Sequence, residues 1–579
     1  MNFDAGTRNE LDDLLEDAFR NRQSRRTFMQ RALAVGGAAG LAYVLPRAVV
    51  AQDATPAGEG DSPGVHIAAE DGVELAEDQV IRLGLTEPKS MDPGVSTGYD
   101  ELGIFFNIFD GLTGIDMATG DVVARCADSW DINEDATEYT FHLNPNLKWS
   151  NGEPITAADF AYSWKRVLDP LTLSLYTPAM HVIKNAMAID AGEMEFGELA
   201  VFAEDDLTLR VEMEASCPFF PLLTSTWTYC PVPQSVVEEH AEAWVEAENI
   251  VSNGPFKMTE WSHDQSIVLE QNEHYYGEIP TITRAEYTIF ADDSTQEYIS
   301  FENDELDFSW PSGADLERIA SDEDAMSQIH RFAQSNCRMV TCDAKTEPTT
   351  NADFRRALYA AIDRDVVADV ILKGTAEPAL NVIPADIPGN NPDAQNEVGE
   401  EAAKAYLEAS GVDASTIELE YSYRVTNDIK LVAEYLEQRW AEVLGIKVKL
   451  NPVDGAVYSE YNQSRADQPF HTKYGTWGSD FADPSNWHNQ NFVSSSDHYY
   501  VSWVNEEYDA LCAQAVSEPD PEVRADLYRQ AEVLLVQDAA YIPVYRGVAT
   551  VAVKPWLVDF HVQPILAYVH LRLPKIAAH

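Results

Sequence analysis

The chain has 579 residues, of which 45% are hydrophobic and 10% aromatic, so it has ample material for packing and is too long for a single core. Its 97 acidic residues exceed its 39 basic ones and give a net charge of −58. This charge excludes nucleic acid and anionic lipid as partners, because both would be repelled. The acids are spread along the whole chain and indicate a solvated acidic coat; attraction of cationic ligands is the alternative.

Residues 1–51 are predicted to be an export signal with an extended leader. Arg25 and Arg26 precede a short apolar run at 32–45, and small residues follow at 49–51. This order is typical of a signal peptide, and the paired arginines indicate the twin-arginine route. A chance arginine pair before a buried helix is the alternative. The run is shorter than the ~20 residues that span a bilayer, and no cysteine for lipid attachment precedes Cys126. We therefore expect a protein exported to the periplasm or to the outer side of the cytoplasmic membrane.

Residues 52–78 are rich in Asp, Glu, Gly, Ala and Pro without an apolar period, which predicts a flexible tether. A strand is then expected over 80–85, followed by a loop over 94–100. Beyond residue 78 strand and helix signals alternate, which indicates mixed α/β lobes.

The most informative stretch is 139–170. Tyr139, Phe141 and Leu143 alternate with polar residues and predict a strand with one buried face. After two turns, Thr156 with Asp159 three residues later predicts a capped helix, which has one apolar face and ends before Pro170. These residues together predict a strand, a double turn and an amphipathic helix.

The sequence of this stretch closely resembles that of the solute-binding proteins of peptide ABC importers, the oligopeptide- and dipeptide-binding group (family 5). Further matching blocks lie at 87–93, 253–257, 353–364, 444–448, 474–484, 542–545 and 554–556. The resemblance therefore runs from about 80 to 573, nearly the whole chain beyond the predicted tether.

The resemblance implies an α/β fold of the periplasmic-binding-protein type II (Venus-flytrap) class, with two hinged lobes and an additional inserted domain. By this analogy the discontinuous lobe I comprises 79–109, 234–335 and 549–579. The inserted lobe II would be 110–233, and lobe III would be 336–548. Two segments between lobes I and III would act as the hinge.

The segment 474–484 is the strongest candidate for a ligand-binding loop. Gly475 and Gly478 permit close approach of another backbone, as edge pairing with an extended ligand requires. The resemblance implies that Asp480 holds the α-amino group of a ligand, with Trp477 lining the cleft and Ser479 between them. A turn carboxylate is the alternative role for Asp480, and Asp483 is expected to be structural.

The other candidate ligand-binding residues are Thr97, Gly98 and Tyr99 on a loop, together with Arg424 and Lys473. Thr97, Gly98 and Tyr99 match the loop of the family whose backbone pairs with bound peptide. Arg424 resembles the arginine that clamps the ligand carboxylate in dipeptide-binding relatives, and a surface ion pair is its alternative. The arginine of longer-peptide relatives is absent, because Tyr474 stands in its place beside Lys473.

No catalytic residue, metal site or cofactor is expected. The phrase Gly94-Val95-Ser96-Thr97-Gly98 formally matches a nucleophile elbow, but Pro93 precedes it in place of a core strand. The histidines are scattered without a zinc motif, and no phosphate-binding glycine loop appears. The six cysteines could form disulfides in an exported protein or remain buried thiols.

The sequence thus predicts a monomeric, non-enzymatic binding protein that closes around a short peptide and delivers it to the permease subunits of an ABC transporter. An oligosaccharide, a metal chelate or another polar metabolite on the same scaffold is the first alternative. A secreted serine hydrolase using Ser96 is the distant one.

Overall fold

The computed structural model describes residues 64–579 except 71, 97–98, 118, 175, 291–293, 456–457, 459–469, 497–500 and 566–567. The predicted export signal therefore lies outside the described residues. Within the described part, no helix combines the length and the apolar character that crossing a membrane requires.

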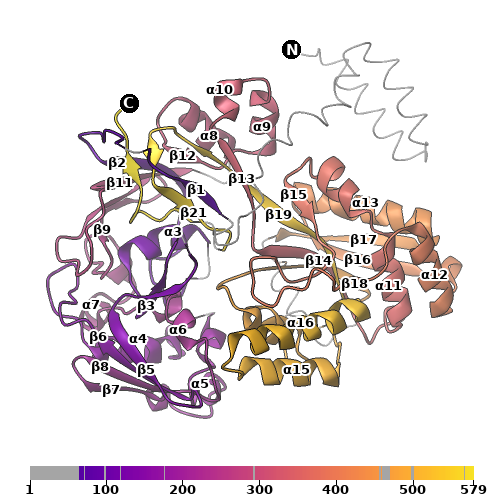
Figure 1. The fold of residues 1–579 in the computed structure, drawn as a ribbon, viewed down its shortest axis with the longest axis horizontal. Coiled ribbons are helices and arrows are strands. Elements are labelled where there is room, and N and C mark those ends of the chain that lie inside the picture. Colours follow the sequence, from indigo (N-terminus) through magenta and orange to yellow (C-terminus); the bar gives the residue numbers. More distant parts are fainter. Residues whose placement is uncertain are drawn as a thin grey trace. The chain divides into compact units, whose positions relative to one another are not determined.

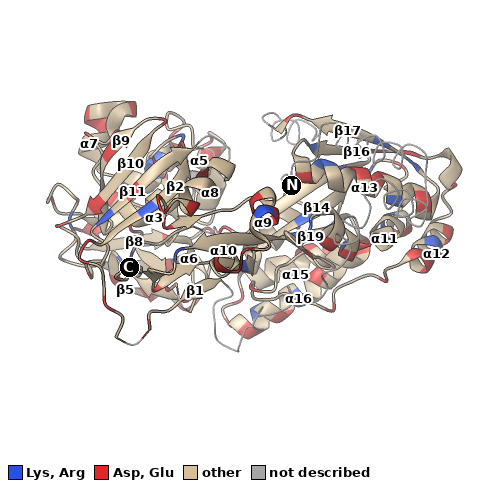
Figure 2. Ribbon diagram, turned by 90° about the horizontal axis from the view of Figure 1, so that it is seen from above, with Lys and Arg blue, Asp and Glu red and all other residues tan. Residues whose placement is uncertain are grey.

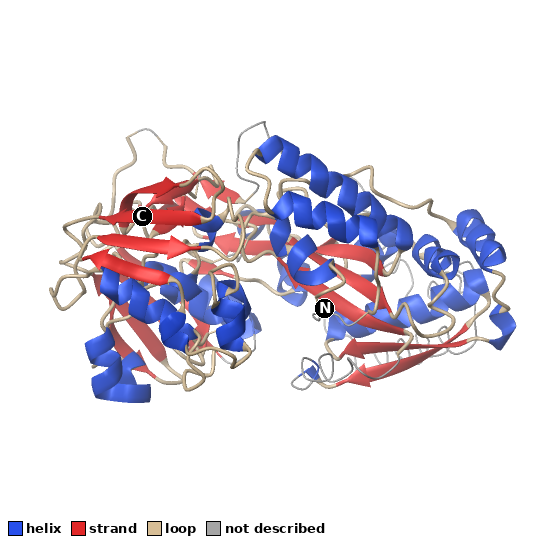
Figure 3. Ribbon diagram, turned by 90° about the horizontal axis from the view of Figure 1, so that it is seen from below, coloured by secondary structure: helices blue, strands red, loops and turns tan. Residues whose placement is uncertain are grey.

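Buried side chains form three large hydrophobic clusters, and we name the lobes after them. The lobe I cluster draws on 65–109, 227–332 and 549–576, the lobe II cluster on 112–229, and the lobe III cluster on 337–545. The three separate cores support the proposed division into three lobes, and the exact lobe boundaries stay a prediction. Strands and helices occur in every lobe (Figures 1 and 3).

Lobe I contains a four-stranded sheet of order β2-β11-β10-β9, in which β2 (Val80–Thr86) runs parallel to β11 (Arg284–Phe290). Its other elements are β1 (Val65–Ile67), α3 (Tyr99–Ile108), α7 (Gln234–His240), β9 (Phe256–Ser262), β10 (Ser266–Gln271), α8 (Ser294–Glu302), β12 (Phe308–Ser309), α9 (Gly313–Ile319), α10 (Glu323–Met326), β13 (Ile329–Ala333), β20 (Leu557–Val558), β21 (Phe560–Val562) and β22 (Lys575–Ile576).

One prediction fails in lobe I. Residues 64–70 fall within the predicted flexible tether, yet Val65–Ile67 forms β1, which pairs antiparallel with β21. Val65 is buried in the lobe I cluster. The partner strand lies almost 500 residues away in the chain, so local composition gave no sign of this pairing.

Lobe II contains a four-stranded antiparallel sheet of order β5-β6-β8-β7, which α4 covers. Its elements are β3 (Thr113–Ile115), β4 (Val122–Ala124), β5 (Ala127–Ile132), β6 (Glu138–Leu143), α4 (Ala157–Val167), α5 (Ala186–Asp190), β7 (Val201–Asp205), β8 (Thr208–Glu212) and α6 (Phe220–Leu223). The predicted strand and helix of the 139–170 stretch are confirmed as β6 and α4. The predicted cap is present, since the Asp159 carboxylate accepts from the Thr156 backbone N–H at 2.8 Å.

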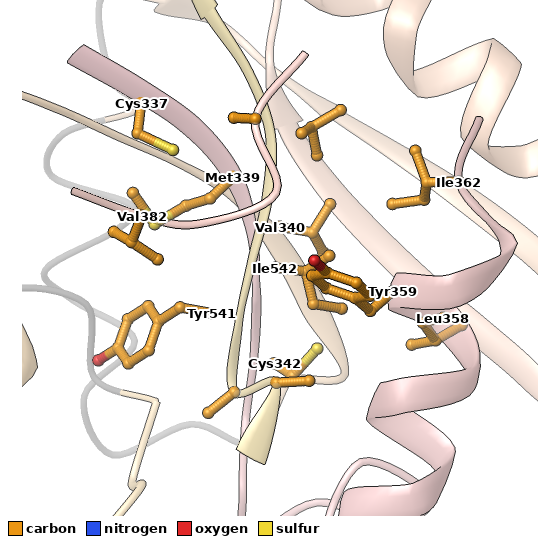
Figure 4. Close-up of a cluster of buried hydrophobic side chains, with 14 of the residues drawn as sticks. Cys337, Met339, Val340, Cys342, Leu358, Tyr359, Ile362, Val382, Tyr541 and Ile542 are labelled. Carbon is orange, nitrogen blue, oxygen red and sulfur yellow. The ribbon is translucent and has the colours of Figure 1, made fainter. Parts of the chain in front are cut away.

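Lobe III is built on the strands β14, β18, β16 and β17, with helices packed around them. Its elements are β14 (Asn336–Cys342), α11 (Ala352–Ala361), η6 (Val366–Ile371), β15 (Ala376–Pro378), α12 (Glu400–Ser410), β16 (Glu418–Arg424), α13 (Asn427–Leu444), β17 (Lys447–Val453), β18 (Thr472–Gly478), η8 (Pro484–Asn486), η9 (His488–Phe492), α15 (Glu506–Val516), α16 (Pro521–Asp538) and β19 (Tyr541–Val553). Figure 4 shows part of its core, where side chains of β14 and β19 meet Leu358 and Tyr359 of α11.

Lobes I and III are joined by two segments that lie side by side. The 13-residue strand β19 pairs with β14 and β15 of lobe III over its first half, and with β12 and β13 of lobe I over its second half. The second segment is 334–336, where the Gln334 N–H donates to the Gly547 carbonyl at 2.9 Å and the Gly547 N–H donates to Asn336 Oδ1 at 2.8 Å. These two segments are the ones expected from the family resemblance to act as a hinge, and hinge motion about them stays a proposal.

The acidic residues follow the sequence expectation, because Figure 2 shows Asp and Glu on elements throughout the fold instead of in one patch. All six cysteines are buried free thiols, which resolves the alternative left open by the sequence. Burial raises the pKa of each of these thiols above its ordinary value.

Candidate binding cleft

A cleft of about 1520 Å³ is lined by residues of all three lobes. Lobe I contributes Gly84 and Glu297, lobe II contributes Tyr176, and lobe III contributes Arg424 and the consecutive residues 474–480. This volume exceeds that of ordinary small-molecule sites, so the cleft has room for an extended ligand.

The strand edge along this cleft is open. β18 pairs with β14 over its full length, from Thr472 to Gly478, but with β16 only at Thr472 and Lys473. The Tyr474 carbonyl accepts from the Tyr458 hydroxyl at 2.7 Å. Among described residues no strand pairs with the other edge of 475–478, so a backbone in the cleft can form ladder hydrogen bonds there.

Asp480 lies at the end of this edge and is half-buried. Burial raises the pKa of its carboxyl above the ordinary value, although hydrogen bonds from Tyr176 and Asn486 oppose the shift. The Asn486 Nδ2 donates to the carboxylate at 3.1 Å and the Asp480 N–H donates to Asn486 Oδ1 at 2.9 Å. No Lys, Arg or His of the described chain forms an ion pair with Asp480. The site therefore holds an anion that a ligand cation can neutralise.

The neighbours of Asp480 fix its position. The Ser479 N–H donates to the Ser335 carbonyl at 2.8 Å, and the two serine hydroxyls share a hydrogen bond of 2.7 Å. The Trp487 indole N–H donates to Ser479 Oγ at 2.8 Å. Ser479 thus anchors the loop to the segment 334–336, next to Asp480.

Asp483 has the structural role expected of it. Its carboxylate forms a two-point ion pair with Arg524, in which Nη2 lies 2.7 Å from Oδ1, and both side chains are buried. The same carboxylate accepts from the Ser485 N–H at 2.8 Å and so caps η8. The two aspartates of one loop therefore differ, since Asp483 is neutralised inside the protein and Asp480 is not.

Arg424, at the end of β16, also lines the cleft. Its side chain is exposed and lies over Gly455, where an added Cβ would come within 3.2 Å of Nε. Within the described residues it makes no hydrogen bond or ion pair, so its guanidinium is available to a ligand carboxylate.

Lys473 and Tyr99 are placed differently from the sequence expectation. Lys473 is fully buried, with its Nζ 4.6 Å from the centre of the Phe470 ring, and it does not line the cleft. It lies where β18 still has β16 beside it, whereas the open edge starts one residue later. Thr97 and Gly98 lie outside the described residues, and Tyr99 is the first residue of α3 in place of a loop residue.

Further cleft residues come from segments for which the sequence gave no functional signal. They include Glu297 of α8, whose pKa is raised by burial and whose Oε1 accepts from the Trp310 N–H at 3.2 Å. Tyr176 and Arg338 also line the cleft. These residues approach the cleft only through the tertiary fold, so spacing along the chain could not identify them.

The geometry around Ser96 does not match a nucleophile elbow. The N–H groups of Val95 and Ser96 both donate to the Asp92 carbonyl at 3.1 Å, so the segment is a turn, and Ser96 is buried. The preceding strand, β2, ends ten residues earlier at Thr86. Among described residues no group of three potential metal ligands occurs either.

An α/β fold with an interlobe cleft, an open strand edge and an anion at its end defines a binding protein for extended ligands. The model of the bacterial extracellular solute-binding proteins, family 5 (middle part), matches residues 121–499. The chain belongs to this family, as the sequence resemblance predicted.

Curated relatives extend the match over most of the chain. The protein named "Probable deoxycholate-binding periplasmic protein" of Escherichia coli is 30% identical over 515 residues, which cover 87% of this chain and 95% of the relative. The oligopeptide-binding protein of Bacillus subtilis is 29% identical, covering 79% of this chain and 86% of its own.

Among solved structures, the oligopeptide-binding protein of Haemophilus influenzae in complex with the peptide RPPGFSPFR is 26% identical. Its TM-score is 0.70, and the match covers 87% of this chain and 100% of that one. The predicted periplasmic-binding-protein type II fold is confirmed.

Proposed function

We propose that this protein captures short peptides in the interlobe cleft and delivers them to the membrane permease of an ABC importer. The observation that carries the proposal is the Asp480 carboxylate, which faces the cleft without an ion-pair partner in the described chain. An α-ammonium group placed there would form a charge-assisted hydrogen bond in a partly dehydrated site.

The open edge of β18 supplies the second element of recognition. Backbone hydrogen bonds to residues 475–478 are the same for every peptide sequence, and they give affinity without strong dependence on side chains. Arg424, on the same cleft, is suited to the carboxylate at the other end of a short peptide. The relatives named for oligopeptide binding support a peptide ligand.

Closure of the lobes about β19 and 334–336 would complete the site, because a ligand that contacts both lobes stabilises the closed form. The proposal includes export by the twin-arginine route, a monomeric state and the absence of catalysis. The turn at Ser96 supports the last point, since its hydroxyl lacks the strand-to-helix setting of a hydrolase.

A second candidate is a non-peptide ligand in the same cleft. The relative named for deoxycholate binding is 30% identical and favours this alternative. Isothermal titration calorimetry with di-, tri- and tetra-alanine, and separately with deoxycholate, distinguishes the two. Saturable heat with a peptide and none with deoxycholate supports the proposal. Heat with deoxycholate and none with any peptide would replace it by the second candidate.

A further inference from the structure

A second cavity, of about 440 Å³, meets the cleft at Asp480. Asp480, Pro564 and Tyr568 line both spaces. The second cavity is otherwise built from other residues, including Arg125 of lobe II and His570 near the chain end. A ligand group held at Asp480 therefore stands at the entrance of this cavity.

One side of the cavity holds nitrogen atoms without hydrogen-bond partners among the described residues. Arg125 follows β4 and lies against Gly114, where an added Cβ would come within 2.8 Å of the arginine Nε. Among the described residues the Arg125 guanidinium has no hydrogen bond or ion pair, and only the backbone N–H of Arg125 donates, to the Leu112 carbonyl at 3.2 Å. The Nε of Arg572 is buried without an acceptor, and the Nδ1 of His570, a residue only 8% exposed, is buried without a hydrogen-bond partner. This side is ready to accept an anion.

The charges of Arg125 and Arg572 act on this side of the cavity. Burial lowers the pKa of His570 well below its ordinary value, and both arginines lower it further, so the imidazole is neutral. The same two arginines oppose the rise in the pKa of Tyr568 that burial causes. Arg125 and Arg572 therefore lie close enough to Tyr568 and His570 to act on them electrostatically.

Besides Asp480, the acidic residues that line the cavity are Asp110 and Asp386. The Asp110 carboxylate is neutralised by its ion pair with Arg572, and it also accepts from the hydroxyls of Tyr275 at 2.8 Å and Tyr276 at 3.0 Å. Asp386 also lines the cavity, and burial raises the pKa of its carboxyl as it does that of Asp480. Within the described chain, neither the Arg125 guanidinium nor the Asp480 carboxylate has an ion-pair partner.

We propose that the second cavity binds the side chain of the ligand's first residue and selects an acidic one, a glutamate, through Arg125. The proposal rests on the function proposed above, in which the α-ammonium of that residue lies at Asp480. Ammonium and side-chain carboxylate of one glutamate would then meet an anion and a cation that the fold leaves unpaired. The neutral imidazole of His570 adds a polar group that can contact the carboxylate.

The test compares three tripeptides that differ only in the first residue: Glu-Ala-Ala, Gln-Ala-Ala and Ala-Ala-Ala. Calorimetry should show that the wild-type protein binds Glu-Ala-Ala about tenfold more tightly than Gln-Ala-Ala, the factor that corresponds to one charge-assisted contact. In Arg125→Gln the affinity for Glu-Ala-Ala should fall to that for Gln-Ala-Ala, which should itself change less than twofold. The matched control Arg529→Gln removes an arginine from the surface of α16 and should keep the preference.

Gly114→Ala provides a second variant if Arg125→Gln folds poorly, because the new Cβ displaces the Arg125 side chain. It should also reduce the preference for glutamate. Equal binding of Glu-Ala-Ala and Gln-Ala-Ala by the wild-type protein overturns the proposal, and so does a preference that survives both variants. Binding of none of the three peptides removes the proposed function, and this inference with it.

Discussion

Asp480→Asn is the substitution that probes the proposed ammonium site most sharply. Asparagine has the same shape and keeps an oxygen that can accept from Asn486, which now donates at 3.1 Å, so the loop should stay in place. Only the negative charge is removed. Because Asp480 has no cationic partner within the described chain, its substitution leaves no buried cation behind.

The expected loss is that of one charge-assisted hydrogen bond, about 1.5–3 kcal/mol, or roughly tenfold to 150-fold in Kd. Calorimetry with tri-alanine and with its N-acetylated form provides the assay. The wild-type protein should bind the acetylated peptide about as weakly as Asp480→Asn binds the free amine. Acetylation should cost the variant little.

The stability of the ligand-free variant provides a control on this reasoning. Because burial raises the pKa of Asp480, the ionised carboxylate is less stable in the fold than in the unfolded chain. Asp480→Asn should therefore be as stable as the wild-type protein or more so. For the same reason, lowering the pH should weaken peptide binding. The decline should begin at a higher pH than it would for an aspartate of ordinary pKa. Unchanged affinity for tri-alanine in Asp480→Asn would refute the assigned role.

Three further outcomes concern stability. Asp483→Asn leaves Arg524 buried without its partner and should lower the free energy of unfolding by about 3–5 kcal/mol in urea titrations, in contrast to Asp480→Asn; an equal, small effect of both would contradict the distinction. Burial raises the pKa of Glu532 to about 8, so its contribution to stability is complete below about pH 4.5 and is lost as the pH rises through 8. Urea titrations across this range should show a fall for the wild-type protein of roughly 3–5 kcal/mol that is absent in Glu532→Gln, and parallel pH profiles would contradict it. Gly254→Ala places a Cβ 2.5 Å from a backbone carbon at the end of α3 and should lower the melting temperature clearly, whereas the control Gly313→Ala in α9 meets nothing within 4 Å and should change it little; similar shifts would count against the packing argument.

The local elements could be predicted from sequence where the pattern is strong. The alternation at Tyr139, Phe141 and Leu143 predicts β6, and the pair Thr156 and Asp159 predicts the cap of α4, because both signals depend on neighbours in the chain. β1 was missed because three residues in a polar segment form a strand only through pairing with β21.

The candidate site was predictable only in part. Asp480 and Trp477 were named through the resemblance, and both line the cleft. Lys473 was predicted to bind ligand because it neighbours Tyr474. In the structure, however, Lys473 is the last residue of β18 that pairs with β16, so it lies before the open edge. The sequence gives no signal for Arg125, because its place beside Asp480 arises only when three lobes enclose the second cavity.

The sharpest test of the central claim is a crystal structure of the protein with tri-alanine. We predict the ligand ammonium nitrogen within about 3 Å of the Asp480 carboxylate, the hydrogen-bond distance of such a pair, with the peptide backbone paired to residues 475–478. A peptide bound elsewhere, or one whose carboxylate end lies at Asp480, would contradict the account.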